Sequence, residues 1–101
     1  MAIEITDHHE RSRYELAVDG QLAGFADYRR RPGVIDLVHT QIDPEFQGQG
    51  LAGKLIAYML DSARAEGLVV EPSCPFVRKF LGDHPADRDL VSAADRARLG
   101  W

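Results

Sequence analysis

A glycine-rich segment between two differently patterned halves constrains the fold most. Residues 43–54 read DPEFQGQGLAGK and hold three glycines within six positions. The residues before this segment are patterned like β-strands, whereas the apolar residues after it recur at helical spacing. A glycine-rich turn that opens a helix leaves backbone N–H groups without intrahelical partners, and the helix dipole favours anions there. We therefore expect a strand–loop–helix unit that binds a phosphate-bearing cofactor.

Antiparallel strands are predicted for the first half of the chain. Residues 14–18, YELAV, place large apolar side chains at alternate positions and stop at Asp19-Gly20, a dipeptide typical of a two-residue hairpin. Residues 22–28 then resume with β-compatible side chains. Residues 3–5 predict a short leading strand, and we expect the polar stretch 7–10 to be a connection. This half therefore predicts an antiparallel β-meander.

A further strand is expected at residues 34–42, after a turn at Pro32-Gly33. Its apolar side chains fall on both parities, which predicts a central strand that is covered on both faces. The basic run Arg29–Arg31 precedes the turn. We interpret it as a solvated hairpin tip, and a patch for an acidic ligand is the alternative.

The pattern after the glycine-rich segment is that of an amphipathic helix over residues 50–66, with Gly67 in place to end it. Residues 68–71 predict a short strand, and a strand–helix–strand passage of this length predicts a right-handed crossover between parallel strands. Pro75 is expected to start a second helix that ends near Gly82. The apolar stripe of the long helix comprises Leu51, Ala52, Leu55, Ile56, Met59, Leu60 and Ala63.

The last residues, 87–101, predict a weaker terminal helix. The expected fold class is therefore α+β, a three-layer α/β arrangement in which an antiparallel meander is followed by a β-α-β crossover and a second helix. The chain has 101 residues, of which 45% are hydrophobic and 28% charged. Such a chain can bury a small core, so we expect residues 1–101 to form one soluble domain.

Charge and cysteine content narrow the setting. The net charge of −4 argues against a nucleic-acid partner, because such proteins usually present a basic face. Cys74 is the only cysteine and cannot form an internal disulfide, and no apolar run approaches the roughly 20 residues of a membrane span. The first residues lack the pattern of a signal peptide, which predicts the cytoplasm. No metal is expected at residues 7–10, DHHE, because neighbouring side chains point apart.

Three phosphate-binding patterns overlap in the glycine-rich segment. Residues 48–53 satisfy the dinucleotide fingerprint G-x-G-x-x-G, and Glu71 lies near the distance expected for a ribose-binding acid. However, a meander precedes the segment, and only about 30 residues follow Glu71, too few for the rest of a doubly wound domain. Residues 48–54 also resemble a P-loop, but Leu55 stands where that motif needs a magnesium-binding Ser or Thr.

The third pattern fits its surroundings best. Residues 47–52, QGQGLA, match Q/R-x-x-G-x-G/A, the acyl-CoA pyrophosphate loop of the GNAT superfamily of N-acetyltransferases. The resemblance to that family extends over most of residues 34–71. With His39-Thr40 upstream and the segment 72–80, PSCPFVRKF, downstream, the chain is similar to a small stand-alone branch often called YjdJ-type.

The resemblance implies acetyl-CoA as the cofactor. Its pantetheine arm would pair with the backbone of residues 40–42, where that strand splays from residues 68–71. Its pyrophosphate would meet the amides of residues 49–52, with Gln47 shaping the turn. Successive N–H groups of this kind form a concave nest for anionic oxygens. The cofactor-binding residues expected on this basis are Thr40, Gln41, Ile42, Gln47, Gly48, Gln49, Gly50, Leu51 and Ala52.

The chain departs from the family in two respects. Many members carry a longer N-terminal helical region that helps to form the acceptor pocket, and a late tyrosine that protonates the leaving thiolate, yet no tyrosine follows Tyr58 here. We therefore expect the acceptor site to be open or completed by a partner subunit, and the protein to be a monomer or a homodimer. The acceptor is expected to be a small-molecule or protein amine.

Two residues are candidates for catalysis. Cys74 precedes the helix that Pro75 starts, and a thiol at a helix N-terminus can become nucleophilic; the alternative is a buried packing residue. His39 has a titration range suited to a base that deprotonates the acceptor amine. The alternative is a hydrogen-bonded strand histidine.

The predicted function is transfer of an acetyl group from acetyl-CoA to an amine, either by direct attack or through a Cys74 acetyl-enzyme. Two other classes remain open. One is a CoA-binding or acyl-sensing module without catalysis, and the other is a dinucleotide- or nucleotide-binding domain.

Overall fold

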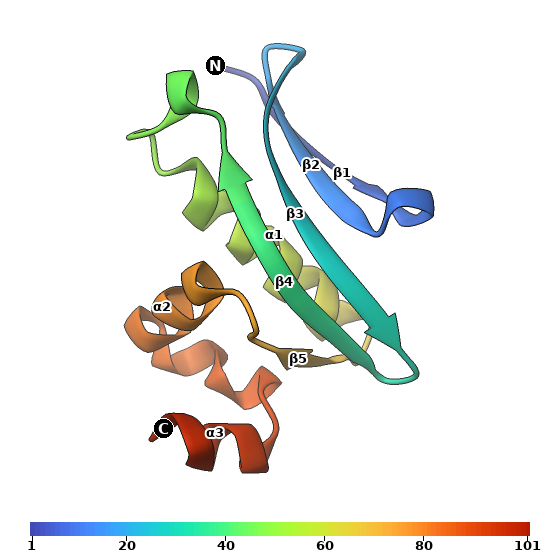
Figure 1. Cartoon of the computed structure of the whole chain (residues 1–101), viewed down its shortest axis with the longest axis vertical. Coiled ribbons are helices and arrows are strands. Elements are labelled where there is room, and N and C mark those ends of the chain that lie inside the picture. The colour runs from blue at the N-terminus through green and yellow to red at the C-terminus, as the bar shows by residue number, and fades with distance from the viewer.

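The computed structural model describes residues 1–101 as a five-stranded sheet with helices packed against it (Figure 1). The strands are β1 (Ile3–His8), β2 (Arg13–Val18), β3 (Gln21–Arg31), β4 (Val34–Ile42) and β5 (Val69–Glu71). The α-helices are α1 (Leu51–Ala65), α2 (Pro75–Asp83) and α3 (Ala93–Leu99), and the 3₁₀ helices are η1 (His9–Arg11), η2 (Pro44–Phe46) and η3 (Pro85–Leu90). None of these helices has the length and apolar character that crossing a bilayer requires.

The strand order of the sheet is β1-β2-β3-β4-β5, so strands that follow one another in the sequence lie side by side. The first four strands pair antiparallel, and β5 returns parallel to β4 after α1. Figure 1 shows α1 behind the sheet, where it runs along β4. The antiparallel meander followed by a β-α-β crossover confirms the predicted α+β fold.

β1 is longer than the sequence predicted. It runs to His8, and Asp7 pairs in register with Tyr14 instead of lying in a connection. The Asp7 carboxylate accepts a hydrogen bond of 2.6 Å from the Tyr28 hydroxyl, which gives this polar residue a partner inside the sheet. Burial, followed by the Asp7 charge, raises the pKa of Tyr14 to about 12. Burial and the bond to Asp7 likewise raise the pKa of Tyr28.

The basic run is exposed, as expected, but it forms the end of β3 and not the hairpin turn itself. Arg30 and Arg31 pair in register with β4, and only Pro32-Gly33 form the turn. Arg30 forms an ion pair of 3.1 Å with Glu66, and Arg31 forms one of 2.7 Å with Glu71. The Arg31 guanidinium lowers the pKa of the Glu71 carboxyl. These ion pairs connect the end of β3 to the far end of the crossover.

β4 contains a bulge. Its pairing with β3 runs to Leu37 and resumes at His39, so Val38 has no partner. Buried side chains therefore change parity along the strand, which explains why the apolar residues fall on both parities. The prediction that the strand is covered on both faces is wrong, because the outer-face side chains are exposed or half-buried. The buried side chains of β4 are Ile35, Leu37 and Thr40.

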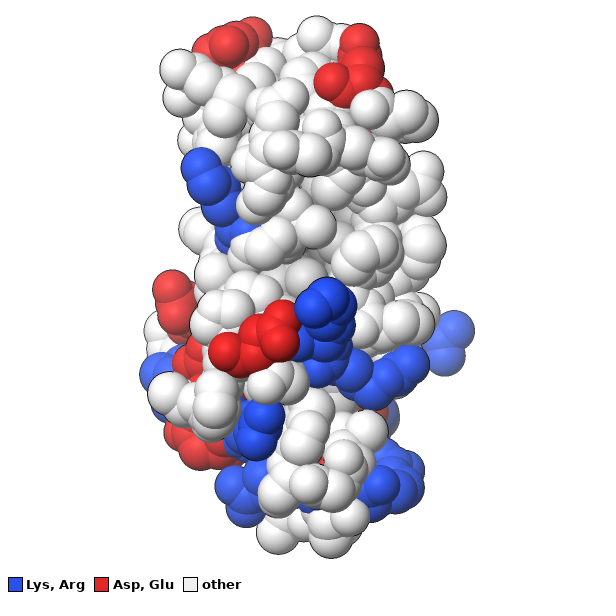
Figure 2. Space-filling model, turned by 90° about the vertical axis from the view of Figure 1, so that its left-hand side faces the viewer, with Lys and Arg blue, Asp and Glu red and all other residues white.

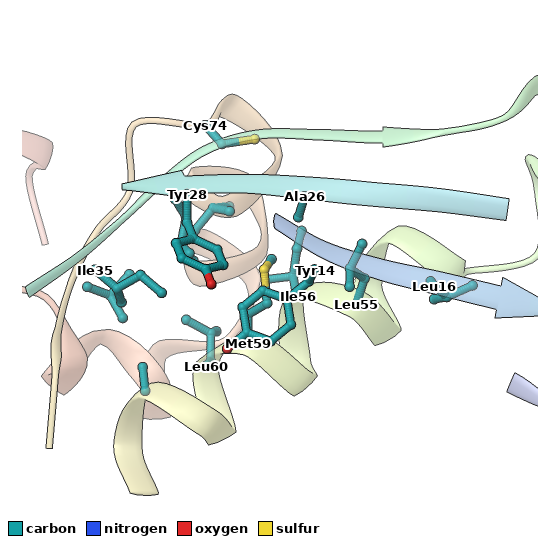
Figure 3. Packing of buried hydrophobic residues seen from close by; sticks show 14 of the residues in the cluster. Tyr14, Leu16, Ala26, Tyr28, Ile35, Leu55, Ile56, Met59, Leu60 and Cys74 are labelled. Carbon is teal, nitrogen blue, oxygen red and sulfur yellow. The ribbon is translucent and has the colours of Figure 1, made fainter. Parts of the chain in front are cut away.

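The core lies between the sheet and one face of α1 (Figure 3). The rings of Tyr14 and Tyr28 lie 5.3 Å apart and are directed from the sheet toward α1 (Figure 3). Burial of one large aliphatic side chain contributes about 1.5–3 kcal/mol, so the stripe of α1 fixes the helix and the glycine-rich segment before it against the sheet. The buried residues of α1 are Leu51, Leu55, Ile56, Met59, Leu60 and Ala63.

The C-terminal part is more divided than the sequence predicted. α2 begins at Pro75, as expected, and ends at Asp83. The predicted terminal helix is instead the 3₁₀ helix η3 followed by the short helix α3. Ser92 separates them, because its side chain accepts a hydrogen bond of 3.1 Å from the backbone N–H of Asp95 and caps α3.

Candidate functional site

The glycine-rich segment presents free backbone N–H groups. Gly48 and Gly50 have left-handed backbone angles, with φ of 81° and 72°, and α1 begins directly after them at Leu51. The Lys54 N–H donates a hydrogen bond of 3.2 Å to the Gly50 carbonyl, at the start of the helix. The amides at the start of α1 therefore have no partner within the helix, and they point outward from its N-terminus. Such a terminus attracts anions.

Open space surrounds these glycines. A Cβ atom placed on Gly48, Gly50 or Gly53 would meet nothing within 4 Å. Positions 48 and 50 require glycine, because an L residue is strained at the left-handed backbone angles found there. Gly53 lies in ordinary helical geometry and has neither a backbone nor a packing requirement for glycine.

A hollow of about 320 Å³ opens beside the glycine-rich segment. All but two of the predicted cofactor-binding residues line it; the exceptions are Gln41 and Gln49. Phe46 and Phe76 also line it, and the sequence reasoning missed both. Phe76 lies on α2 and is 56% exposed, which is unusual for an aromatic residue. Its position directly after Pro75, in the first turn of the predicted helix, was the only feature of the sequence that pointed to it. The lining residues are Thr40, Ile42, Phe46, Gln47, Gly48, Gly50, Leu51, Ala52 and Phe76.

The hollow lies where β4 and β5 part. Their pairing ends at Asp36 opposite Glu71, and the Cys74 N–H donates a hydrogen bond of 2.8 Å to the Leu37 carbonyl. Beyond this point β4 has no strand on that edge. The Asp43 N–H donates a hydrogen bond to the Ala23 carbonyl of β3. Because the backbone groups of successive strand residues point to opposite sides, the N–H and C=O of Ile42 point toward the open edge.

The side chain of Gln47 closes the end of this open edge. Its amide Nε2 donates a hydrogen bond of 3.2 Å to the Ile42 carbonyl. This contact holds the start of the glycine-rich turn against the last residue of β4. The open edge and the free N–H groups of α1 are thus held next to each other.

Cys74 lies directly behind the hollow. Its side chain is 1% exposed, and its sulfur lies 3.6 Å from the hydroxyl of Thr40, a buried residue that lines the hollow. Figure 3 shows Cys74 beside β4, at the margin of the labelled core residues. The structure therefore brings Cys74 to the site while covering its sulfur.

His39 lies apart from Cys74. It follows the bulge, is exposed, and has the parity opposite to that of Thr40. Its Nε2 lies 3.2 Å from the side-chain oxygen of Gln41, and its ring lies 5.9 Å from that of Phe25. His39 and Gln41 therefore share the outer face of the sheet, away from the hollow.

Charged side chains are sparse around the hollow. Figure 2 views the side of the molecule that carries the glycine-rich segment and α2, and its upper half is mostly uncharged, apart from acidic groups at the top and one basic side chain at the left. Basic and acidic groups mix in the lower half. Recognition of an anion at the start of α1 therefore falls mainly to the backbone.

The histidines near the N-terminus lie beside carboxylates. The two nitrogens of His8 lie 3.3 Å from Glu10 and 3.1 Å from Glu15, and His9 lies 3.2 Å from Asp7. The structure contains no group of three or more His, Cys, Asp or Glu side chains placed to hold a metal ion.

Comparison with known proteins identifies the family. A family model described as GCN5-related N-acetyl-transferase matches residues 13–90. This chain belongs to that family. The bovine (Bos taurus) protein NATD1 is 30% identical over 57 residues, which cover 56% of this chain and 50% of NATD1. The chain thus spans about half the length of this curated relative.

Solved structures share the GNAT fold. A GCN5-like protein from Staphylococcus aureus aligns with a TM-score of 0.68 at 23% identity, covering 88% of this chain and 87% of that one. The N-acetylglutamate synthase of Neisseria gonorrhoeae, solved with coenzyme A and N-acetyl-glutamate, aligns with a TM-score of 0.52 at 21% identity, covering 83% of this chain and 22% of that one. At these identities the likeness shows the fold alone.

Proposed function

We propose that this protein is an N-acetyltransferase that binds acetyl-CoA in the hollow beside the glycine-rich segment and acetylates an amine. The observation that carries this proposal is the meeting of two features: free N–H groups at the start of α1, and an unpaired edge of β4 ending at Ile42. Membership of the GCN5-related family and the coenzyme A in a structural neighbour support the same donor.

The residues present fit the chemistry of this donor. The amides of Gln49, Gly50, Leu51 and Ala52 would hold its pyrophosphate, because left-handed glycines let backbone N–H groups approach anionic oxygens closely. The backbone of residues 40–42 would pair with the amides of its pantetheine arm. The apolar walls made by Phe46 and Phe76 would exclude water. When bound, acetyl-CoA supplies an acetyl group activated as a thioester.

The chain's own contribution is orientation and proton transfer. Acetylation of an amine forms a C–N bond, breaks the thioester C–S bond and releases one proton from the nitrogen. We propose that the amine attacks directly. The sulfur of Cys74 is covered next to Thr40, and a Cys74 acetyl-enzyme would require that sulfur to move into the hollow. His39 would act as the base only for an acceptor that reaches the open edge from the outer face.

The test of the donor is a melting experiment with acetyl-CoA, CoA, NAD and ATP measured side by side. Acetyl-CoA and CoA are expected to stabilise the protein, by about 2.7 kcal/mol at a concentration of 100 times Kd. Stabilisation by NAD or ATP in preference to CoA would support a nucleotide-binding domain instead. Stabilisation by CoA without release of thiol in the presence of any amine would support a binding module without catalysis.

The test of the route is the intact mass of the protein after incubation with acetyl-CoA and no amine. Direct attack predicts an unmodified chain. An acetyl adduct on Cys74 that disappears when an amine is added would establish the acetyl-enzyme route. The Cys74→Ser variant separates the two further, because direct attack leaves its rate of transfer close to that of the unaltered protein.

A further inference from the structure

A second hollow, of about 550 Å³, lies between the end of β5 and α3. Its lining differs from that of the first hollow, because it is dominated by charged and hydroxyl side chains: Glu71, Ser73, Arg78, Asp95 and Arg98. Nothing in the donor site described above uses these groups.

The second hollow adjoins the place where β4 and β5 part. The Ser73 hydroxyl donates a hydrogen bond of 2.5 Å to the carboxylate of Asp36, which belongs to the last residue pair of the two strands. Ser73 lines the second hollow, and Phe76 lines the first. The short segment that contains Cys74 therefore borders both hollows.

Of the charged side chains that line the second hollow, some have partners of opposite charge and one does not. Glu71 is already held by two hydrogen bonds from Arg31, at 2.8 and 2.7 Å, and Asp95 is paired with Arg98. Arg78 has no carboxylate partner. Its Nη1 donates to the carbonyls of residues 72 and 73, at 3.0 and 2.7 Å, and its other nitrogens make no hydrogen bond.

The geometry points to Arg78 as the binding group for a carboxylate on the acceptor. We propose that the second hollow takes a small amino acid, whose carboxylate meets Arg78 and whose amine is acetylated at the edge of the first hollow; this rests on the proposed function. A guanidinium matches a carboxylate with two parallel N–H···O bonds. Contacts to neutral carbonyls hold the Arg78 side chain in place and leave it without a carboxylate partner. The ammonium group first loses one proton to solvent; the amine then forms the amide C–N bond as the thioester C–S bond breaks, and its second proton passes to the leaving thiolate, which departs as CoA.

The experiment measures thiol release from acetyl-CoA with free L-amino acids and with the amines that correspond to them without the carboxylate, such as L-alanine and ethylamine. At least one amino acid is expected to have a kcat/KM about tenfold above that of its amine, the size of effect expected from one charge-assisted hydrogen bond. Arg78→Gln is expected to abolish this preference while leaving the affinity for acetyl-CoA unchanged. Arg78→Lys, which keeps the charge, is expected to restore part of the preference.

Arg96→Gln is the matched control, because Arg96 lies on α3 near Arg98 but outside the second hollow. This variant is expected to keep the preference for carboxylates. The inference is overturned if the amines are acetylated as well as the amino acids, or if Arg78→Gln keeps the preference. It is also overturned if the protein binds acetyl-CoA but acetylates no amino acid, an outcome that leaves the donor site intact. Failure to bind acetyl-CoA would remove the proposed function itself.

Discussion

Substitution of Gly50 by alanine tests the role of the glycine-rich segment in both folding and binding. Gly50 has a φ of 72°, and an added Cβ would meet nothing within 4 Å, so the change affects the backbone and not the packing. A left-handed angle destabilises an L residue by roughly 1–2 kcal/mol. Alanine also lowers the entropy of the unfolded chain, which offsets about 0.4–1 kcal/mol of that cost. Gly50→Ala should therefore destabilise the protein by about 1 kcal/mol.

Gly53→Ala is the matched control, because it adds the same atom into equally open space at a helical residue. Alanine is favoured over glycine inside a helix by about 0.5–1 kcal/mol, so this variant should be at least as stable as the unaltered protein. The two variants should then differ by roughly 2 kcal/mol, or about 10 °C in Tm for a domain of this size. Urea unfolding followed by circular dichroism measures the difference.

The same pair separates two functional hypotheses. The acyl-CoA pattern requires Gly50 but not Gly53, whereas the dinucleotide fingerprint requires Gly53 for close packing of the helix. Gly50→Ala should weaken acetyl-CoA binding about tenfold or more if the strained angle is lost, and Gly53→Ala should leave it unchanged. Equal stability and affinity of the two variants, or a loss confined to Gly53→Ala, would refute the reasoning.

Three further predictions concern the sheet and Cys74. Tyr28→Phe removes the hydrogen bond to Asp7 and should cost about 1–3 kcal/mol at neutral pH. Because the folded state raises the pKa of Tyr28 above 10, the unaltered protein keeps this stability below pH 10 and loses it as the pH rises further. The variant should lose less stability above pH 10 in urea titrations, and parallel pH profiles would contradict this cause. Gly24→Ala should destabilise the protein by about 1–3 kcal/mol, because the new Cβ would lie 2.5 Å from Ile42 Cδ1 and 2.7 Å from the Gln41 carbonyl oxygen. A Tm equal to that of the unaltered protein would show that β3 and β4 separate without cost. Cys74 should react with iodoacetamide slowly in the folded protein and faster as urea is added, because its side chain is 1% exposed. Rapid labelling without urea would mean that its sulfur reaches solvent.

Elements with strong local signals could be predicted from the sequence. Asp19-Gly20 and Pro32-Gly33 form the two hairpin turns, and the apolar stripe from Leu51 to Ala63 forms the buried face of α1. In each case the deciding interactions lie within a few neighbouring residues. Local chemistry therefore determined the meander and the crossover.

Features that depend on distant partners could not be predicted. Asp7 lies in a strand because Tyr28, 21 residues away, supplies its hydrogen bond, and Arg31 lies in a strand beside Glu71, 40 residues away. The bulge at Val38 is defined by the pairing of β4 with β3. Without that pairing, the apolar pattern of residues 34–42 indicated a strand buried on both faces.

The candidate site was predictable only in part for the same reason. The turn that holds Gly48 and Gly50 is local, whereas the hollow also needs Phe76 from the next helix. The bulge sets His39 on the outer face, away from Cys74, although both were candidates for one catalytic site. The cover over the sulfur of Cys74 depends on Thr40, a residue 34 positions earlier.

The most direct measurement of the donor site is a titration of the ¹⁵N-labelled protein with acetyl-CoA, followed through its backbone amide NMR signals. The largest shifts are expected at Gly48–Gly53 and at Thr40–Ile42, which border the first hollow. Signals of the second hollow, such as those of Asp95 and Arg98, should move little. Shifts concentrated at the second hollow, or no shifts at millimolar acetyl-CoA, would contradict the proposed donor site.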